Sequence, residues 1–283
     1  MIGLGAMGGA ISANLVKAGF DVTGYDVSPA RVKAFRKAGG KPASSVKTLK
    51  APVIITSLPS AAALHQVSAL LKHKSVVIET STLPIEDKER ARDVLKKKGI
   101  TLLDCPLSGT GAQAKTKDLV VFGSGDKKSF QKIADVLPGF SRSHYYLGEF
   151  GNGSRMKFVA NLLVAIHNVS AAEAFVLGMK AGLPAKSIFE VIENSAGSSR
   201  MFQVRGPMMV AGRYDDVTMK NEVWQKDMKI IGEFAAKLGV PTPLFNASAA
   251  IYSAAMAQGY AKEDTGAVCA VMEAMAGVRR KRR

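Results

Sequence analysis

Short apolar runs alternate with longer segments of helical periodicity through the first half of the chain. Glycine, proline, serine or aspartate bounds the short runs, which is typical of strands buried in a sheet. They predict strands at 21–26, 52–57, 75–79, 101–105 and 119–123. The segments between them have apolar residues three and four positions apart, which predicts helices at 10–18, 30–38, 61–71 and 85–98. Strands that alternate with helices indicate an α/β fold with a doubly wound parallel sheet.

The pattern changes near Gly148, beyond which the chain shows long helical patterns and no convincing strand. Helices are predicted at 154–181, 185–194, 224–238, 243–258 and 264–275. The glycine-containing stretch 148–153 is a natural boundary, so we expect an α/β domain at 1–150 and an all-α C-terminal domain at 151–283. The basic segment 278–283 is expected to be a disordered tail. The longest apolar runs fall short of a membrane span, so no membrane association is expected.

Basic residues outnumber acidic residues, 39 against 23, which gives the 283-residue chain a net charge of +16. The positive charges are spread along the chain, without the interleaved aromatic residues that stack nucleic-acid bases. We therefore expect a basic surface that attracts anionic ligands, and not a nucleic-acid interface. Two cysteines, Cys105 and Cys269, suggest no disulfide framework and fit the reducing cytoplasm. A signal peptide is not expected, because the chain opens directly on a glycine motif.

The opening residues, M-I-G-L-G-A-M-G, place glycines at positions 3, 5 and 8. This G-x-G-x-x-G spacing between a strand and a helix is the pattern by which Rossmann-like domains bind the pyrophosphate of a dinucleotide. Asp26 ends the next strand, where a carboxylate binds the adenosine ribose and favours NAD over NADP. Arg31 lies near enough to permit some use of NADP. Only two residues precede the first glycine, so we expect a shortened first strand or a natural start upstream.

Small or polar residues also follow three other strands, at 57–60, 80–82 and 108–111. In open α/β sheets, ligands bind outside the carboxyl ends of the strands. One such loop would only reflect the usual composition of loops. Together with the glycine motif there are four such loops at successive strand ends, and this number predicts a shared cleft.

A narrow polar stripe runs along the predicted helix at 154–181. Lys157, Asn161 and Asn168 fall on one face at about 100° per residue, and apolar residues occupy the other faces. A stripe that faced solvent, the usual position of lysines, would normally carry more charge. Burial of a lysine and two amides is costly without partners. We therefore predict a buried stripe that contributes Lys157 and Asn161 to a site.

With these residues, the chain resembles the β-hydroxyacid dehydrogenases, a family that includes 3-hydroxyisobutyrate, L-threonate and 6-phosphogluconate dehydrogenases. The family's I-G-L-G-x-M-G motif, L-P dipeptide and S-T pair are matched at 2–8, 58–59 and 81–82. Its substrate motif D-x-P-x-S-G resembles 104–109, its catalytic motif G-x-G-x-x-x-K-x-x-x-N resembles 151–161, and its K-D pair resembles 226–227. Thr110 replaces a second glycine of many members. Segments 195–202 and 259–264 look more like the L-threonate branch than like 3-hydroxyisobutyrate dehydrogenase.

The resemblance implies hydride transfer between NAD, with NADP as a second option, and a small 3-hydroxy acid such as 3-hydroxyisobutyrate, L-threonate or glycerate. Lys157 would be the general acid and base, with Asn161 beside it as the second catalytic residue. The implied cofactor-binding residues are Gly3, Gly5, Ala6, Met7, Gly8, Asp26, Leu58, Pro59, Thr82 and Lys226, and the implied substrate-binding residues are Ser108, Gly109 and Thr110. No metal is expected. Residues 1–150 would bind the dinucleotide, and residues 151–283 would contribute to the substrate site and to a homodimer or homotetramer.

Two other functions fit parts of the sequence. Imine reductases resemble the same scaffold, but they typically lack a lysine at the position of Lys157. A non-catalytic nucleotide- or nucleic-acid-binding scaffold would account for the charge of +16, but it would have no use for the pair formed by Lys157 and Asn161. The sequence therefore favours a cytoplasmic dehydrogenase that acts on a small carboxylate.

Overall fold

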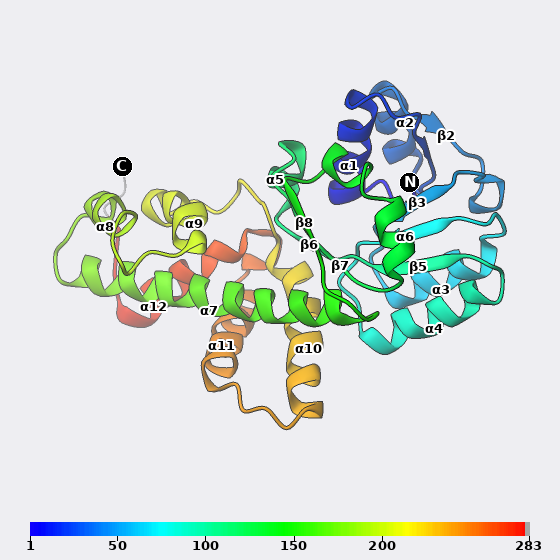
Figure 1. Ribbon diagram of the computed structural model, residues 1–283. Coiled ribbons are helices and arrows are strands. Elements are labelled where there is room, and N and C mark those ends of the chain that lie inside the picture. The colour runs from blue at the N-terminus through cyan, green and yellow to red at the C-terminus, as the bar shows by residue number, and fades with distance from the viewer. Residues whose placement is uncertain (281–283) are drawn as a thin grey trace. The chain divides into compact units, whose positions relative to one another are not determined.

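The computed structural model describes residues 1–280 (Figure 1). The chain divides into two compact units, Met1–Phe158 and a second unit from Val159 onward. The division falls inside the long helix α7 (Asn152–Lys180). The first unit therefore includes the opening turns of this helix.

The first unit is built on short paired strands. These are β1 (Thr23–Gly24) with β2 (Lys41–Pro42), the group β3 (Val53–Thr56), β4 (Val76–Glu79) and β5 (Thr101–Asp104), and the group β6 (Leu107–Ser108), β7 (Val120–Gly123) and β8 (Ser143–Tyr146). Ile2 joins the first two groups, because it forms parallel bridges to Tyr25 and to Thr56. The resulting parallel order is β2, β1, Ile2, β3, β4, β5, which is the strand order of the dinucleotide-binding fold. The predicted doubly wound sheet is confirmed, and its first strand is reduced to one bridged residue.

Beyond β5 the pattern of pairing changes. Asp104 at the end of β5 forms an antiparallel bridge to Ser124. β6 then runs antiparallel to β7, and β8 runs parallel to β7. The helices of the unit besides the start of α7 are α1 (Ala6–Lys17), α2 (Pro29–Lys37), α3 (Ala61–Leu70), α4 (Ile85–Lys96), α5 (Gly111–Lys115) and α6 (Lys127–Lys132), with 3₁₀ turns η1 (Val46–Thr48) and η2 (Leu137–Gly139).

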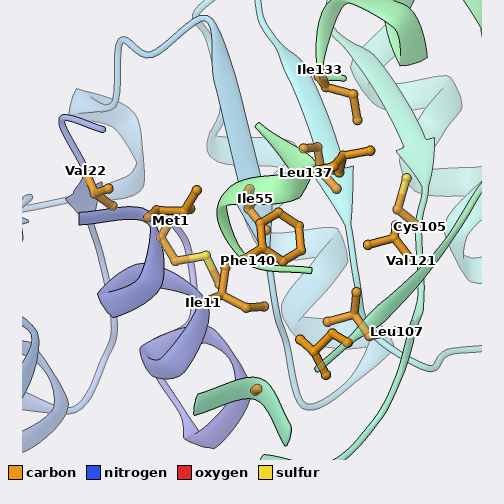
Figure 2. Close-up of a cluster of buried hydrophobic side chains, with 14 of the residues drawn as sticks. Met1, Ile11, Val22, Ile55, Cys105, Leu107, Val121, Ile133, Leu137 and Phe140 are labelled. Atoms are coloured by element: carbon orange, nitrogen blue, oxygen red, sulfur yellow. The ribbon is translucent and has the colours of Figure 1, made fainter. Parts of the chain in front are cut away.

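Alternate residues of the central strands enter two separate hydrophobic cores. Ile55, Ile78 and Leu103 pack with α1 and with the η2 region on one face, and Figure 2 shows part of this cluster around Phe140. Their neighbours Ile54, Val77 and Leu102 pack with α3 and α4 on the other face. Successive side chains of a strand point to opposite faces, so both faces of the sheet are covered. This is why the strands read as continuous apolar runs.

The second unit is helical. Apart from α7, its elements are α8 (Ala185–Ile192), α9 (Arg200–Ala211), α10 (Asn221–Lys237), α11 (Pro243–Ala257) and α12 (Val268–Ala276), with 3₁₀ turns η3 (Tyr260–Lys262) and η4 (Thr265–Ala267). Helices α10 and α11 pack against each other as a hairpin (Figure 1). Up to residue 280, this unit forms a single isolated bridge, between Lys220 and Asp264, and no strand. The predicted all-α region is confirmed.

The expectation of a disordered tail from residue 278 is wrong for its first three residues. The backbone N–H of Val278 donates to the carbonyl of Glu273 at 2.9 Å. The guanidinium of Arg280 binds the Glu273 carboxylate, with Nε 3.0 Å from Oε1, and Nη1 donates to the carbonyl of Val210 at 2.8 Å. A buried carboxylate and an open helix end thus hold Arg280 in place. The rest of the predicted tail, 281–283, lies outside the described residues.

Helix α7 also differs from expectation, because it is long and apolar enough to cross a membrane by length and composition. Its most apolar 18-residue window has a mean hydropathy of 1.6. Asn161 donates to Asp227 of α10, however, and Asn168 donates to the hydroxyl of Tyr252 on α11. Amides buried against partner helices are typical of the core helix of a folded domain. The composition of α7 therefore supports no membrane assignment.

Candidate active site

The glycine loop has the shape that pyrophosphate binding requires. Gly3 has φ +87°, and a Cβ built there would lie 2.1 Å from the carbonyl oxygen of Ser57. A Cβ on Gly8 would lie 1.9 Å from the carbonyl oxygen of Gly3, which shows how closely the helix packs on the loop. Gly5 is different, since a Cβ there would meet only the guanidinium of Arg31, at 3.9 Å. The first and third glycines therefore serve the fold, and the second leaves open space beside the backbone.

That open space lies at the N-terminus of α1. Gly5 is the N-cap residue and provides no side chain for capping, and the first turn has no acidic residue. The first N–H groups of a helix need partners from outside the helix, and they favour anions. Ala6 and Met7 belong to this turn. The loop thus fits the pyrophosphate of a dinucleotide.

Asp26 lies beside the glycine loop, and its carboxylate has a structural role. Its Oδ2 accepts a hydrogen bond from the backbone N–H of Leu4 at 2.6 Å, and its Oδ1 accepts one from Ser28 at 2.8 Å. The side chain is 4% exposed, and Nη1 of Arg31 lies 3.6 Å from its Oδ2. Asp26 therefore fastens the glycine loop to the start of α2 and also provides negative charge where the adenosine ribose would bind.

Hydrogen bonds join the next two strand ends to the glycine loop. The N–H of Ser57 donates to the carbonyl of Ile2 at 2.9 Å. The N–H of Leu58 donates to Oγ of Ser81 at 2.8 Å, and the N–H of Ser81 donates to Oε1 of Glu79 at 2.9 Å. The structure thus brings the loops at 57–60 and 80–82 together. Pro59 is exposed and Thr82 is half-buried in this group.

The predicted substrate loop, 108–110, follows β5. Ser108 lies in β6, where it pairs with Val120, and both Ser108 and Gly109 are partly exposed. Thr110 is the N-cap residue of α5, and its N–H donates to Oε1 of Gln113 at 3.0 Å. This backbone donor is therefore engaged in helix capping. Ser108 and the N–H of Gly109 remain the better candidates for carboxylate binding.

Lys157 lies in the second turn of α7 and is 9% exposed. The start of this helix packs directly on the ends of the strands. A Cβ built on Gly153 would lie 2.2 Å from the carbonyl oxygen of Phe122 and 2.7 Å from that of Asp104. The second glycine of the G-x-G-x-x-x-K motif is therefore needed for this close approach, which brings the turn that carries Lys157 to the ends of β5 and β7.

The other two polar residues of the predicted stripe, Asn161 and Asn168, are also buried, as predicted, but they have different partners. Nδ2 of Asn161 donates to Oδ2 of Asp227 at 2.9 Å, and Nζ of Lys226 lies 3.4 Å from Oδ1 of the same carboxylate. The K-D pair therefore orients Asn161 through Asp227, a role that the sequence did not predict. Asn168 belongs to a structural network, since its Nδ2 donates to the hydroxyl of Tyr252 at 2.9 Å.

Two family profiles match this chain. Residues 1–148 match the NAD binding domain of 6-phosphogluconate dehydrogenase. Residues 151–272 match the NAD-binding domain of NADP-dependent 3-hydroxyisobutyrate dehydrogenase. The chain belongs to the β-hydroxyacid dehydrogenase family. As a member, it is an NAD(P)-dependent oxidoreductase that acts on hydroxy acids.

Individual members of the family match nearly the whole chain. L-threonate dehydrogenase of Cupriavidus necator is 31% identical over 95% of this chain and 93% of its own length. The crystal structure of a 3-hydroxyisobutyrate dehydrogenase from Salmonella typhimurium is 29% identical, has a TM-score of 0.84, and is matched over 95% of this chain and 98% of that one. A 3-hydroxyisobutyrate dehydrogenase of Mycobacterium tuberculosis, solved with L-serine, is 27% identical with a TM-score of 0.85, over 96% and 97% of the two chains. These similarities favour a β-hydroxyacid dehydrogenase over a non-catalytic scaffold.

Proposed function

We propose that this enzyme oxidises a small 3-hydroxy acid reversibly, with NAD preferred over NADP and with Lys157 as the general acid and base. When bound, the nicotinamide accepts or returns a hydride at its C4 carbon. In oxidation, Nζ of neutral Lys157 takes the proton from the substrate hydroxyl. In reduction, the ammonium group of Lys157 gives that proton back. A positioned side chain that moves this proton contributes about 10²- to 10⁴-fold to the rate.

The other residues have supporting roles in this proposal. Asn161, one helical turn beyond Lys157, hydrogen-bonds the substrate hydroxyl oxygen and is oriented by Asp227. Ser108 and Gly109 bind the substrate carboxylate through hydroxyl and N–H donors. Thr82 positions the nicotinamide ring, and Lys226 contributes positive charge to cofactor binding.

One observation carries the proposal: a single lysine is buried in the second turn of a helix that begins at the carboxyl ends of the strands. Ligands of such sheets bind at this edge. Burial of a lysine is costly, and proton transfer to a ligand bound at this edge is a function that a buried lysine can serve.

The test is Lys157→Ala, compared with Lys180→Ala at the exposed end of the same helix. We expect turnover to fall about 10²-fold or more for Lys157→Ala, because the proton acceptor is lost. The Michaelis constant for the cofactor is expected to change by about two-fold at most, since the glycine loop is untouched. Lys180→Ala retains wild-type kinetics. A Lys157→Ala enzyme with near wild-type turnover would refute the assignment.

A substrate panel identifies the hydroxy acid. We propose L-threonate as the first candidate, because the segments 195–202 and 259–264 resemble that branch and an L-threonate dehydrogenase is 31% identical to this chain. 3-Hydroxyisobutyrate, D-glycerate and L-serine complete the panel, each with NAD and with NADP, and reduced cofactor is measured by its absorbance. No turnover of any 3-hydroxy acid in the panel would contradict the proposed substrate class.

We also propose that the enzyme works in the cytoplasm as a homodimer or homotetramer. Apolar side chains are exposed along α7, namely Met156, Val159, Leu163 and Leu177. Several large apolar side chains exposed along one helix are typical of a protein interface. Light scattering of the purified protein measures the state directly, and a monomer at micromolar concentration would contradict it.

A further inference from the structure

A buried cluster of charged side chains lies beneath the strand ends, and none of its members is among the predicted site residues. Lys88, Glu79 and Asp104 each have 0% relative exposure. Nζ of Lys88 lies 2.6 Å from Oε2 of Glu79 and 2.8 Å from Oδ1 of Asp104. Burial of three charged groups is costly unless each has well-placed partners. Each of the three has a partner inside the cluster, but buried ion pairs are often no more stabilising than apolar packing, so stability alone does not account for them.

The cluster has one positive side chain, Lys88, and two negative ones, Glu79 and Asp104, so its charges do not cancel. Burial by itself would lower the pKa of Lys88, but Asp104 and Glu79 outweigh burial and hold this pKa above its usual value. Lys88 is thus a permanent cation that faces two carboxylates. The second positive partner of Asp104 is the N-terminus of α7, where the helix dipole favours negative charge.

Asp104 and Ser124 bind the first turn of α7. The backbone N–H of Ser154 donates to Oδ2 of Asp104 at 2.8 Å, and Oγ of Ser154 donates to Oδ1 at 2.8 Å. Ser124 connects the same groups, since its Oγ accepts from the N–H of Gly153 at 2.9 Å and lies 3.2 Å from Oδ2 of Asp104. Two N–H groups that the helix itself cannot satisfy are therefore fixed to the ends of β5 and β7.

The same cluster also reaches the loop after β4. Glu79 holds Lys88 through Oε2 and accepts the N–H of Ser81 through Oε1, and Ser81 in turn accepts the N–H of Leu58. Lys157 is three residues beyond Ser154, which places it one turn above the anchored N–H. One buried network thus fixes both the proposed proton donor and the loop that leads to Thr82.

We propose that Asp104 is a positioning residue for Lys157. It holds the first turn of α7 at the ends of β5 and β7, and so fixes the place from which the side chain of Lys157 extends. This inference rests on the proposed function, in which Lys157 transfers the proton. Displacement of a catalytic group by about 1 Å can cost as much as 10²-fold in rate. A role confined to overall stability would leave the turnover of the folded enzyme unchanged.

Asp104→Asn tests the proposal, because the amide keeps one acceptor for Ser154 and leaves Lys88 balanced by Glu79. We expect kcat to fall about ten-fold or more, while the Michaelis constant for NAD changes by about two-fold at most. Backbone hydrogen exchange of residues 153–157 in the cofactor-free protein is expected to become faster. Ser154→Ala removes only the hydroxyl donor, so kcat should fall about three-fold with faster exchange at the same residues. Ser170→Ala, the same change at an exposed position of α7, should match the wild type.

If Asp104→Asn does not fold, Ser154→Ala carries the test alone. Hydrogen exchange at 153–157 that stays at the wild-type rate in a folded variant of Asp104 or Ser154 overturns the proposal, whether or not Lys157→Ala lowers turnover. Faster exchange with an unchanged kcat also overturns it, provided that turnover depends on Lys157. Turnover that does not depend on Lys157 would instead refute the proposed function. The exchange rates would still show whether Asp104 holds the first turn of α7.

Discussion

Asp26 combines a structural role with a charge that bears on cofactor choice. Both its oxygens accept backbone hydrogen bonds, and Arg31 lies 3.6 Å away with its side chain 55% exposed. A 2′-phosphate placed beside this carboxylate would be repelled by it and attracted by Arg31. We therefore propose that the balance between these two side chains decides between NAD and NADP.

Asp26→Asn should shift this balance toward NADP. The amide retains an acceptor for the glycine loop but loses the negative charge, and Arg31 loses its ion-pair partner. We expect the ratio of kcat/KM for NADP to that for NAD to rise about ten-fold, which corresponds to about 1.4 kcal/mol. Initial rates with both cofactors measure it, with Asp21→Asn at an exposed neighbouring position as the control. An unchanged ratio would show that the charge of Asp26 does not select the cofactor.

Between elements, Asp264 joins three segments of the helical unit. Its Oδ1 accepts from Nε of Arg205 on α9 at 2.8 Å and from the N–H of Gly266 at 2.9 Å. Its Oδ2 accepts from the N–H groups of Thr218 and Met219 at 2.8 and 3.0 Å. Burial by itself would raise the pKa of Asp264, but Arg205 and these donors outweigh it and lower the pKa below its usual value.

This lowered pKa makes the helical unit sensitive to acid. Because the folded-state pKa is depressed, the stabilisation is complete above the unfolded pKa of about 4 and is lost as the pH falls through the lower folded value. Asp264→Asn should lose about 3–5 kcal/mol at pH 7, since Arg205 then has no buried counter-ion. The variant should also show a flatter acid dependence than the wild type.

Urea unfolding at pH 7 and near pH 3, followed by circular dichroism, measures both effects. Asp215→Asn is the matched control, because the Asp215 carboxylate is exposed and pairs with exposed Arg213 at 3.5 Å. It should change the unfolding free energy by about 0.5 kcal/mol at most. Parallel pH curves for the wild type and Asp264→Asn would contradict the argument.

Some helices and strands could be predicted from the sequence pattern, and others could not. The buried strands β3, β4 and β5 were predicted to within a residue or so, because continuous apolar runs reflect burial on both faces. β8 was missed, since its segment Ser143–Tyr146 is partly exposed and lacks an apolar run. α9 was missed because Gly206 and Pro207 lie inside it. Gly206 is required there by packing, since a Cβ would lie 2.4 Å from the ring of Phe189.

On the scale of the whole molecule, the net charge of +16 should act on the anionic substrate. A positive field raises the local concentration of carboxylates, and salt screens it over about 10 Å at 0.1 M ionic strength. With saturating cofactor, we expect KM for the hydroxy acid to rise several-fold between about 0.02 and 0.5 M salt, with kcat unchanged. Steady-state kinetics over a salt series measures this. A KM independent of salt would assign the charge to another role.

The sequence by itself determined the fold class, the buried central strands with the helices between them, and the family. These features follow from local patterns, namely glycine spacing, apolar runs and the motif around Lys157. Backbone geometry links each such pattern to one local structure. The tertiary structure decided which side chains meet. Asp104 reaches Ser154 across 50 positions, and Asn161 reaches Asp227 across 66. Periodicity assigns a residue to a face, but only the packing of one element on another selects its partner, so these contacts could not be predicted from the sequence.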